Sequence, residues 1–308
     1  GTILQEGSLM RQSMQLFSFF LATILVASLV VVAHAQEEKP PEGEKEKVTT
    51  IRTDQMLRVS KDHSIWIDLK RKWVVVDGWV CLREGELEMF ACTVGTKEHE
   101  SVITLKTKSR LVHASLLAVG AKIGNTVKFS PEYKAASGTV IDIIVLWKDK
   151  DEKKHAVPGQ QWVKHHRSGK SLEYPWVFAG SGFFKDELSM SEIYYGDGGD
   201  LLCVSNFSSA TMDLPVQSSK DNNDLLYQAR TASIPPVQTS VRMVMIPRLK
   251  EKLPEGKIAS AMDAKSPLLK EVLKLEPPED EPDPEEKPAE PKKPDEPKDS
   301  TKAPTPGS

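Results

Sequence analysis

Residues 87–103 of the chain read LEMFACTVGTKEHESVI. The apolar run that begins at Leu87 predicts a strand, and a small turn at Gly95 ends it. Four ionisable side chains and a serine follow at residues 97–101, which we name the KEHES loop, before apolar residues return at Val102. The stretch therefore predicts a strand–loop–strand unit that gathers chemically active side chains between two segments that favour burial.

Segments on both sides of this unit also have strand character. Residues 72–82 (KWVVVDGWVCL) are apolar on both alternating faces, as expected of a central strand. The Arg83-Glu84-Gly85 triplet predicts a hairpin turn that joins this strand to residues 86–94. Further β-branched or alternating runs predict strands at residues 64–69, 138–147, 174–184, 200–207 and 241–246.

Helical patterns are fewer. Residues 109–121 place Val112, Leu116 and Val119 on one face and end at Gly120, a natural C-terminal cap. Residues 160–166 and 221–230 are weaker helix candidates. The sequence thus predicts an α+β fold over residues 48–250, mostly antiparallel β-sheet with one principal helix, and the ends of the chain are expected to be disordered.

The N-terminal region has the pattern of an export signal. Residues 1–9 carry no pattern and are interpreted as an upstream extension before a start at Met10 or Met14. Residues 10–35 combine Arg11, an apolar run at residues 16–32, and the small residues Ala33-His34-Ala35. We expect cleavage after Ala35 and export to the periplasm or the extracellular space. The alternative is an uncleaved membrane anchor, because the apolar run approaches the ~17 residues that can span a bilayer.

The segments that flank the domain are polar or proline-rich. Residues 36–47 form a charged leader, and residues 276–308 contain ten prolines and eleven acidic residues. Such segments bury too little apolar surface to order themselves, so we expect both to be disordered. Residues 251–275 are interpreted as a linker with a short amphipathic helix that starts at Pro267, is capped by Ser266, and docks on the domain or on a partner.

Charge and cysteine content exclude two classes of function. The net charge of −3 gives no reason to expect a nucleic-acid partner. The chain has three cysteines, Cys81, Cys92 and Cys203, each in an apolar strand, so buried free thiols are favoured over a Cys81–Cys92 disulfide across the predicted hairpin. Three cysteines without clustered spacing argue against an iron–sulfur cluster. The sequence does not identify any other cofactor.

The KEHES loop supplies the first candidate site, made of Lys97, Glu98, His99, Glu100 and Ser101. His99 between two glutamates is a candidate metal ligand or general base. Alternation along a strand would send Glu98 and Glu100 to the face opposite His99, whereas a turn would allow contact. His113 on the following helix is a candidate second nitrogen ligand. The alternative is a structural one, in which His99 is hydrogen-bonded at a junction and the glutamates form ordinary ion pairs.

A second candidate region is residues 176–184 (WVFAGSGFF). Its small residues Gly180, Ser181 and Gly182 leave room for a ligand against Trp176 and Phe178. Ser181 lacks the Gly-x-Ser-x-Gly spacing of a hydrolase nucleophile elbow. A tight bend or bulge within a strand is the alternative interpretation.

Several blocks of the sequence resemble one known family. The run LEMFAC followed by TKEHES and then by LVHASLLAVGA, together with the later blocks WVFAGSG, CVSNF and DLPV, is similar to the YdjY domain family, in particular to the longer exported versions found in planctomycete bacteria. The resemblance covers residues 48–247 and implies a bacterial origin. It gives weight to residues 97–101 and His113 but implies no established activity. Some family members are labelled ferredoxin-like, which the cysteine count here does not support.

Two classes of function follow from these observations. The first is an exported binding or interaction module of the cell envelope that holds a metal or small ligand near His99. The second is a metal-dependent or hydrolytic enzyme that uses His99, His113 and one of Glu98 or Glu100. The expected partner is a protein or small molecule of the cell envelope, and membrane contact is expected only through an uncleaved signal segment.

Overall fold

The computed structural model describes residues 50–185, 190–219, 225–251 and 257–279. The predicted upstream extension, signal segment, leader and nearly all of the predicted tail lie outside the described residues. Among the described residues, no helix is both long and apolar enough to cross a bilayer.

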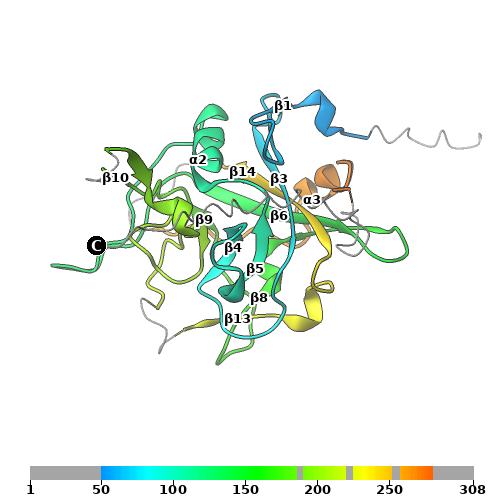
Figure 1. Cartoon of the computed structure of the whole chain (residues 1–308). Coiled ribbons are helices and arrows are strands. Elements are labelled where there is room, and N and C mark those ends of the chain that lie inside the picture. Colours follow the sequence, from blue (N-terminus) through cyan, green and yellow to red (C-terminus); the bar gives the residue numbers. More distant parts are fainter. Residues whose placement is uncertain (1–49, 186–189, 220–224, 252–256, 280–308) are drawn as a thin grey trace, which may run out of the picture. The chain divides into compact units, whose positions relative to one another are not determined.

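The domain is built on one large twisted sheet (Figure 1). Its main path follows the strand order β12-β4-β5-β3-β14-β6-β7. The short strand β2 pairs with β3 and with β1, and β9 pairs with β6. Every described pairing between named strands is antiparallel except that of β4 with β5. The strands of this sheet are β1 (Leu57–Arg58), β2 (Ile65–Asp68), β3 (Trp73–Val80), β4 (Met89–Thr93), β5 (Ser101–Leu105), β6 (Val140–Lys148), β7 (Lys154–Pro158), β9 (Trp176–Val177), β12 (Leu202–Cys203) and β14 (Ser240–Pro247).

Two small sheets and a few helices complete the described structure. One small sheet pairs β10 (Phe183–Lys185) with β11 (Glu192–Tyr194), and the other pairs β8 (Val163–His165) with β13 (Tyr227–Ala229). The α-helices are α2 (Ser109–Ala118) and α3 (Pro267–Val272). The 3₁₀ helices are η2 (Thr53–Gln55), η3 (Glu98–Glu100), η4 (Gly159–Trp162), η5 (Tyr195–Gly198) and η7 (Thr231–Ser233). The prediction of a mostly antiparallel α+β fold with one principal helix is confirmed.

The central strands are apolar on both faces because each face covers its own core. On β3, Val74 and Val76 belong to the main core, whereas Trp73 and Val75 belong to a second one. The same alternation divides β6 and β14. Successive side chains of a strand point to opposite faces, so continuous apolar runs require cover on both sides.

The two α-helices cover different cores. Helix α2 buries Val112 and Leu116 in the main core and is followed by Gly120 at φ 101°, as its sequence predicts. Helix α3 lies within residues 257–276, which we name the C-terminal strap. Its Ser266 cap accepts a hydrogen bond from the Leu268 N–H, and Leu269 and Val272 are buried in the second core. The predicted docking of the amphipathic helix on the domain is therefore confirmed.

The predicted hairpin at residues 83–85 is wrong. Strands β3 and β4 do not pair, because β5 lies between them and pairs antiparallel with β3 and parallel with β4. After the turn, Leu87 donates its N–H to Tyr227 O instead, and Gly85 O accepts from the Ala229 N–H. Local turn residues favoured a hairpin, but long-range pairing with β13 determines the path.

Other predicted elements are shorter than expected or of another type. Residues 160–166 form the end of η4 and then β8, not an α-helix. Residues 227–229 are strand β13, and residues 220–224 of the predicted third helix lie outside the described residues. The strands expected at 174–184 and 200–207 reduce to β9, β10 and β12, and the positive φ angles of Gly180 (92°) and Ser181 (54°) interrupt the first of them.

Candidate functional site

The KEHES loop joins two parallel strands, so its backbone returns from the end of β4 to the start of β5. It does so through the single turn of η3. Glu98 accepts a hydrogen bond from the Gly95 N–H, and its carboxylate lies 3.5 Å from the Thr104 hydroxyl. The Ser101 hydroxyl donates to the Lys97 carbonyl oxygen at 2.7 Å. Glu98 and Ser101 therefore shape the loop itself.

Lys97 is the centre of an ion-pair network. Its Nζ lies 3.0 Å from Asp200, 3.3 Å from Glu100 and 3.6 Å from Glu88, and it lies 4.9 Å from the ring centroid of Phe207. Burial opposes a charge on this amine, but the carboxylates, Asp200 first, outweigh it and raise the pKa of Lys97 to about 12. A lysine held in this way stays protonated at neutral pH, so it is not available as a base.

Asp200 reaches Lys97 because the segment after η5 packs closely against the loop. Gly199 has φ 114°, and a Cβ built on it would lie 2.8 Å from both Lys97 Cγ and Thr96 Oγ1. Any side chain at position 199 would strain the backbone and push the two segments apart. The same segment is tied to α2 by the ion pair between Arg110 and Asp197.

The two candidate histidines have separate surroundings. His99 is 78% exposed, and its only described partner is Glu100, at 3.8 Å. His113 is half-buried, with Nδ1 2.9 Å from the Tyr194 hydroxyl and its ring edge-on to Phe178. Burial lowers the pKa of His113. The described contacts of the two rings share no residue, and in the described ranges no group of three or more His, Cys, Asp or Glu side chains is placed to hold a metal.

The residues predicted to line a ligand pocket lie beneath His113. Trp176 and Phe178 are fully buried in the main core, and the Trp176 indole donates to Cys203 O. Ser181 donates to Ser209 O at 2.6 Å. The hydroxyl groups of Tyr194 and Thr211 are hydrogen-bonded to each other at 3.0 Å. The structure thus brings His113 together with this bend, but Trp176 and Phe178 present no surface to a ligand, and their role as ligand contacts stays a prediction.

A buried polar pair lies behind Phe207. The Asp213 carboxylate accepts hydrogen bonds from Asn206 Nδ2 at 3.1 Å and from the Leu214 N–H at 2.7 Å. Asp213 is fully buried, and this burial raises its pKa to about 7. Because this carboxyl group has no solvent contact, we interpret it as a structural part of the core.

Two of the three cysteines, Cys81 and Cys92, lie next to β5. All three cysteines are free thiols, as expected. Cys81 follows the end of β3 and Cys92 lies on β4, so the two flank β5. The Cys81 thiol donates a hydrogen bond to Ser101 O at 3.1 Å. We name Cys81 and Cys92 the thiol pair.

The KEHES loop covers the buried member of this pair. Ser101, Thr96 and the Lys97 N–H each act to lower the pKa of the Cys92 thiol. The hydrogen bond from Cys81 outweighs burial and lowers the pKa of Cys92 to about 6, and the same bond, with burial and Glu98, raises the pKa of Cys81.

Sequence reasoning placed these cysteines in the core and weighed a pairing of Cys81 with Cys92, but across a hairpin that does not form. Cys92 has its covering residues four, five and nine positions downstream, at Thr96, Lys97 and Ser101. That spacing brings the loop back over Cys92 only when β4 and β5 are parallel. The sequence pattern predicts a hairpin at residues 83–85 and does not predict this parallel pairing. The usable signal was the presence of two cysteines within and just before the one stretch rich in polar functional groups.

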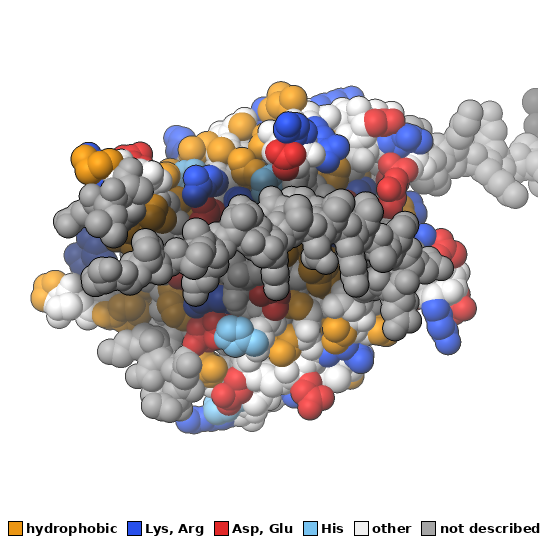
Figure 2. Space-filling view, in the orientation of Figure 1, with side chains coloured by type: hydrophobic (Ala, Val, Ile, Leu, Met, Phe, Trp, Pro, Cys, Tyr) orange, Lys and Arg blue, Asp and Glu red, His pale blue; other side chains and the backbone are white. Residues whose placement is uncertain are grey.

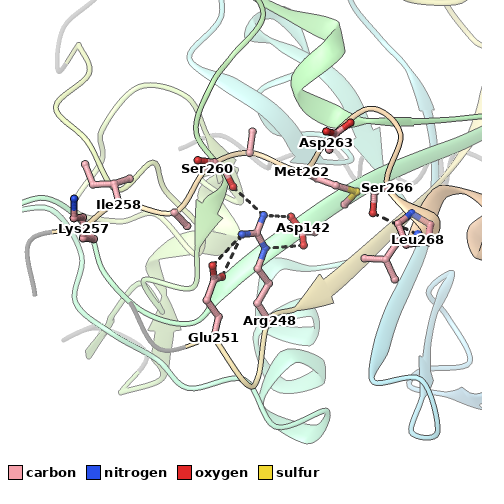
Figure 3. A pocket seen from close by; sticks show the side chains of 13 residues that line it. Asp142, Arg248, Glu251, Lys257, Ile258, Ser260, Met262, Asp263, Ser266 and Leu268 are labelled. Atoms are coloured by element: carbon pink, nitrogen blue, oxygen red, sulfur yellow. Dashed lines mark hydrogen bonds and ion pairs between the residues drawn. The ribbon is translucent and has the colours of Figure 1, made fainter. Parts of the chain in front are cut away.

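Two clefts lie away from the loop. One, of about 700 Å³, is lined by the strap and by Arg248, which pairs with Asp142 through two contacts of 2.8 Å and also reaches Glu251 and Ser260 O (Figure 3). The other, of about 610 Å³, has Trp66 as its base, with the guanidinium carbons of Arg58 at 5.8 Å and Arg242 at 5.5 Å from its ring. Arg248 and Arg242 are both tied to a buried aspartate, which gives them a structural role.

Aromatic side chains are exposed on the β10–β11 hairpin. Phe183 is 58% exposed, and Phe184 stacks on Tyr195 at 4.7 Å. Hydrophobic side chains are visible at the upper left of Figure 2, where β10 lies in Figure 1. A patch of a few apolar side chains is common on protein surfaces and does not by itself indicate a partner.

Comparison with known proteins places the chain in a family. The family model described as the YdjY domain matches residues 65–246, more than half of the 308 residues. The matched segment contains the KEHES loop and the thiol pair and ends before the strap. No curated protein and no solved structure matches the chain. By the length of this match, the chain belongs to the YdjY domain family.

Proposed function

We propose that the protein is an exported binding module of the cell envelope and that its ligand is held by the thiol pair under the KEHES loop. The observation that supports this proposal best is the position of two cysteines on the two sides of β5, with the Cys81 thiol donating to Ser101 O. Sulfur is soft and polarisable, and thiolates bind soft metal ions and other thiophilic groups. The ligand we propose is therefore thiophilic.

Binding is favoured over acid–base catalysis because the ionisable groups of the loop are already engaged. Lys97 is paired with three carboxylates, and Glu98 holds the turn at Gly95. A catalytic pair needs two groups that converge on one reacting atom about 3 Å away. His99 and His113 have no described contact in common, so the enzyme alternative has less support than the binding module.

The half-buried position of Cys81 supports a route for the ligand. Cys92 is fully buried, whereas Cys81 retains some solvent contact. A ligand would first reach the Cys81 sulfur and then engage Cys92. The Lys97 N–H is suited to orient the inner sulfur, because outer-shell hydrogen bonds fix the ligand atoms of a site.

The dithiol reagent phenylarsine oxide tests this proposal on the purified, reduced full chain. The reagent forms two As–S bonds and releases its oxygen as water with the two thiol protons, so stable binding requires two adjacent thiols. We expect one equivalent per chain, resistant to a monothiol and removed by 2,3-dimercaptopropanol. Cys81→Ser and Cys92→Ala should each abolish this stable binding, whereas Cys203→Ala should keep it. Equal stable binding by all variants, or none by the native chain, would refute the proposal.

Export is tested separately in cells. The signal pattern at residues 10–35 predicts a mature N-terminus at Gln36 in the soluble envelope fraction. Terminal sequencing of the chain from that fraction measures this directly. An intact chain found only in the membrane fraction would support the uncleaved anchor instead.

A further inference from the structure

The cleft with Trp66 at its base, which we name the Trp66 cleft, lies where the C-terminal strap ends. Glu276 donates its N–H to Ile51 O at 2.8 Å, so the backbone is fixed at this point. Pro277 and Glu279, which follow, line the cleft themselves. The strap therefore leads the chain into the cleft at the last residue that the structure describes.

The domain side of the Trp66 cleft carries more positive than negative charge. Its described lining has three cations, Arg58, Lys106 and Arg242, against two carboxylates, Asp54 and Asp77. Arg242 is already held by Asp77, through contacts of 2.7 Å and 2.9 Å. The cleft is therefore suited to a ligand with negative charge.

Arg58 retains hydrogen-bond donors for such a ligand. Its described hydrogen bonds use Nε, which donates to Ser60 O at 3.0 Å, and Nη2, which donates to Lys61 O at 3.1 Å. A guanidinium group has five N–H donors, so three are left beyond these two contacts. Among the described residues Arg58 forms no ion pair, and its guanidinium carbon lies 5.8 Å from the centre of the Trp66 ring. A carboxylate bound to Arg58 would therefore lie beside an aromatic surface.

The segment that follows Glu279 has the matching chemistry. Residues 280–286 read DEPDPEE, with five carboxylates, two prolines and no cation. A residue before proline favours extended backbone, and extended proline-containing segments bind aromatic grooves at a low ordering cost. At ~3.1 Å per residue, seven residues span ~22 Å. This length is sufficient to cross a cleft of about 610 Å³.

We propose that residues 280–286 dock in the Trp66 cleft of the same chain, with their carboxylates on Arg58 and Lys106 and their prolines against Trp66. This inference concerns a second surface and does not depend on the thiol pair. Covalent attachment gives such a segment an effective concentration in the millimolar range, so weak contacts suffice. The docked segment closes the cleft to other acidic peptides, and the expectation of disorder then applies from residue 287 onward. Because exposed ion pairs add little to stability, docking is measured as competition for the cleft and not as a change in melting temperature.

Competition between the tail and a free peptide tests the inference. A labelled peptide of residues 280–291 is titrated with the full chain and with the chain that ends after Glu279, and fluorescence anisotropy measures binding. If the tail has an effective concentration of about 1 mM and the peptide a Kd of about 100 µM, the full chain should bind the peptide about ten-fold more weakly than the shortened chain. Raising the ionic strength from about 0.01 M to about 0.15 M should weaken binding, because the Debye length falls from about 30 Å to about 8 Å.

Matched variants identify the contacts. In the shortened chain, Arg58→Glu should weaken peptide binding by about five-fold or more, because it replaces an ion pair by a repulsion. Arg167→Glu is the control, since Arg167 is exposed and lies outside the described lining, and it should bind like the shortened chain itself. A peptide in which amides replace all carboxylates should not bind, and a peptide with alanine in place of proline should bind more weakly.

Four results would overturn the inference. The first is no peptide binding to the shortened chain at low ionic strength, and the second is equal binding to both chains. The third is undiminished binding by Arg58→Glu or of the amide peptide, which would place the contact elsewhere. The fourth is dimerisation of the full chain that the shortened chain lacks, which would assign the tail to the cleft of a second copy. Arg58 is exposed, so we expect its variant to fold.

Discussion

The loop side of the sheet, with β4, β5 and the KEHES loop, differs in kind from the strap side, with α3. On the loop side, ion pairs to Lys97 and hydrogen bonds hold a chemically active thiol pair in place. On the strap side, Leu269, Val272 and Leu275 are buried in an apolar core, and hydrogen bonds such as Lys154 to Leu275 O add to this contact. The family match covers the first side and ends before the second. The comparison suggests that the strap supplies stability, whereas the loop supplies the chemistry.

Removing the strap should have the largest effect on folding. Ending the chain after Glu251 deletes three buried aliphatic side chains, each worth about 1.5–3 kcal/mol, so the loss is on the order of 5 kcal/mol or more. Whole domains are stable by only about 5–15 kcal/mol. We therefore expect this shortened chain to unfold or aggregate, as measured by circular dichroism and light scattering.

A matched truncation after Glu279 keeps the strap and removes only residues of the predicted tail. It should melt at the same temperature as the full chain. If the chain that ends at Glu251 also melts at the temperature of the full chain, the strap contributes nothing to stability. The contrast between the two sides of the sheet then fails.

The second largest effect should be a dependence of the free energy of unfolding on pH, and we assign it to the loop side. The raised pKa of Asp213, about 7, means that the folded protein binds a proton more tightly than the unfolded chain. Its contribution to stability is complete below the unfolded pKa of about 3.9 and is lost as the pH rises through 7, by at most about 1.4 kcal/mol per pH unit.

Urea unfolding at pH 5 and at pH 8 measures this difference. We expect the native chain to be less stable at pH 8, and Asp213→Asn to show a smaller difference between the two pH values. An Asp213→Asn chain with the full native pH dependence would place the titrating group elsewhere.

The fold was predictable where it depends on local periodicity. The alternating and continuous apolar runs predict β3, β6 and β14, and the 3.6-residue pattern with Gly120 and Ser266 predicts both α-helices and their ends. The parallel pairing of β4 with β5 was not predictable in this way, because it depends on contacts between distant residues such as Leu87 and Tyr227. The triplet at residues 83–85 has a local preference that these contacts override.

The site was only partly predictable for the same reason. Charge density in the sequence points to the KEHES loop as an unusual region. Asp200 and Cys81 complete the network of the loop. Both come from other parts of the chain, so the spacing of residues within the loop does not predict them. The consequence is that Lys97, a candidate functional residue in the sequence, is an ion-pair centre in the structure.

Lys97→Met tests that structural role and should have a moderate effect. Removing the cation leaves Glu88, Glu100 and Asp200 facing one another, and for a partly exposed network we expect a loss of about 2 kcal/mol. Urea unfolding measures the loss. Asp200→Asn added to Lys97→Met should recover part of it, because one of the unpaired charges is then gone. No recovery would argue against the network as described.

His99→Ala should have the smallest effect. The side chain is 78% exposed and has one weak partner, so we expect the free energy of unfolding to change by less than about 0.5 kcal/mol. Differential scanning calorimetry provides the comparison with the native chain. A loss of several times this size would show that the loop depends on His99.

The contact between the two thiols is the central claim, and bridging by dibromobimane tests it most directly. This reagent becomes fluorescent only when both of its arms have alkylated thiols, so it reports two sulfurs within a few ångströms. Peptide mapping of the reduced, folded chain after treatment should yield one fluorescent product that joins the peptides of Cys81 and Cys92. Single alkylation of Cys81 without a bridge, or a bridge that involves Cys203, would contradict the account.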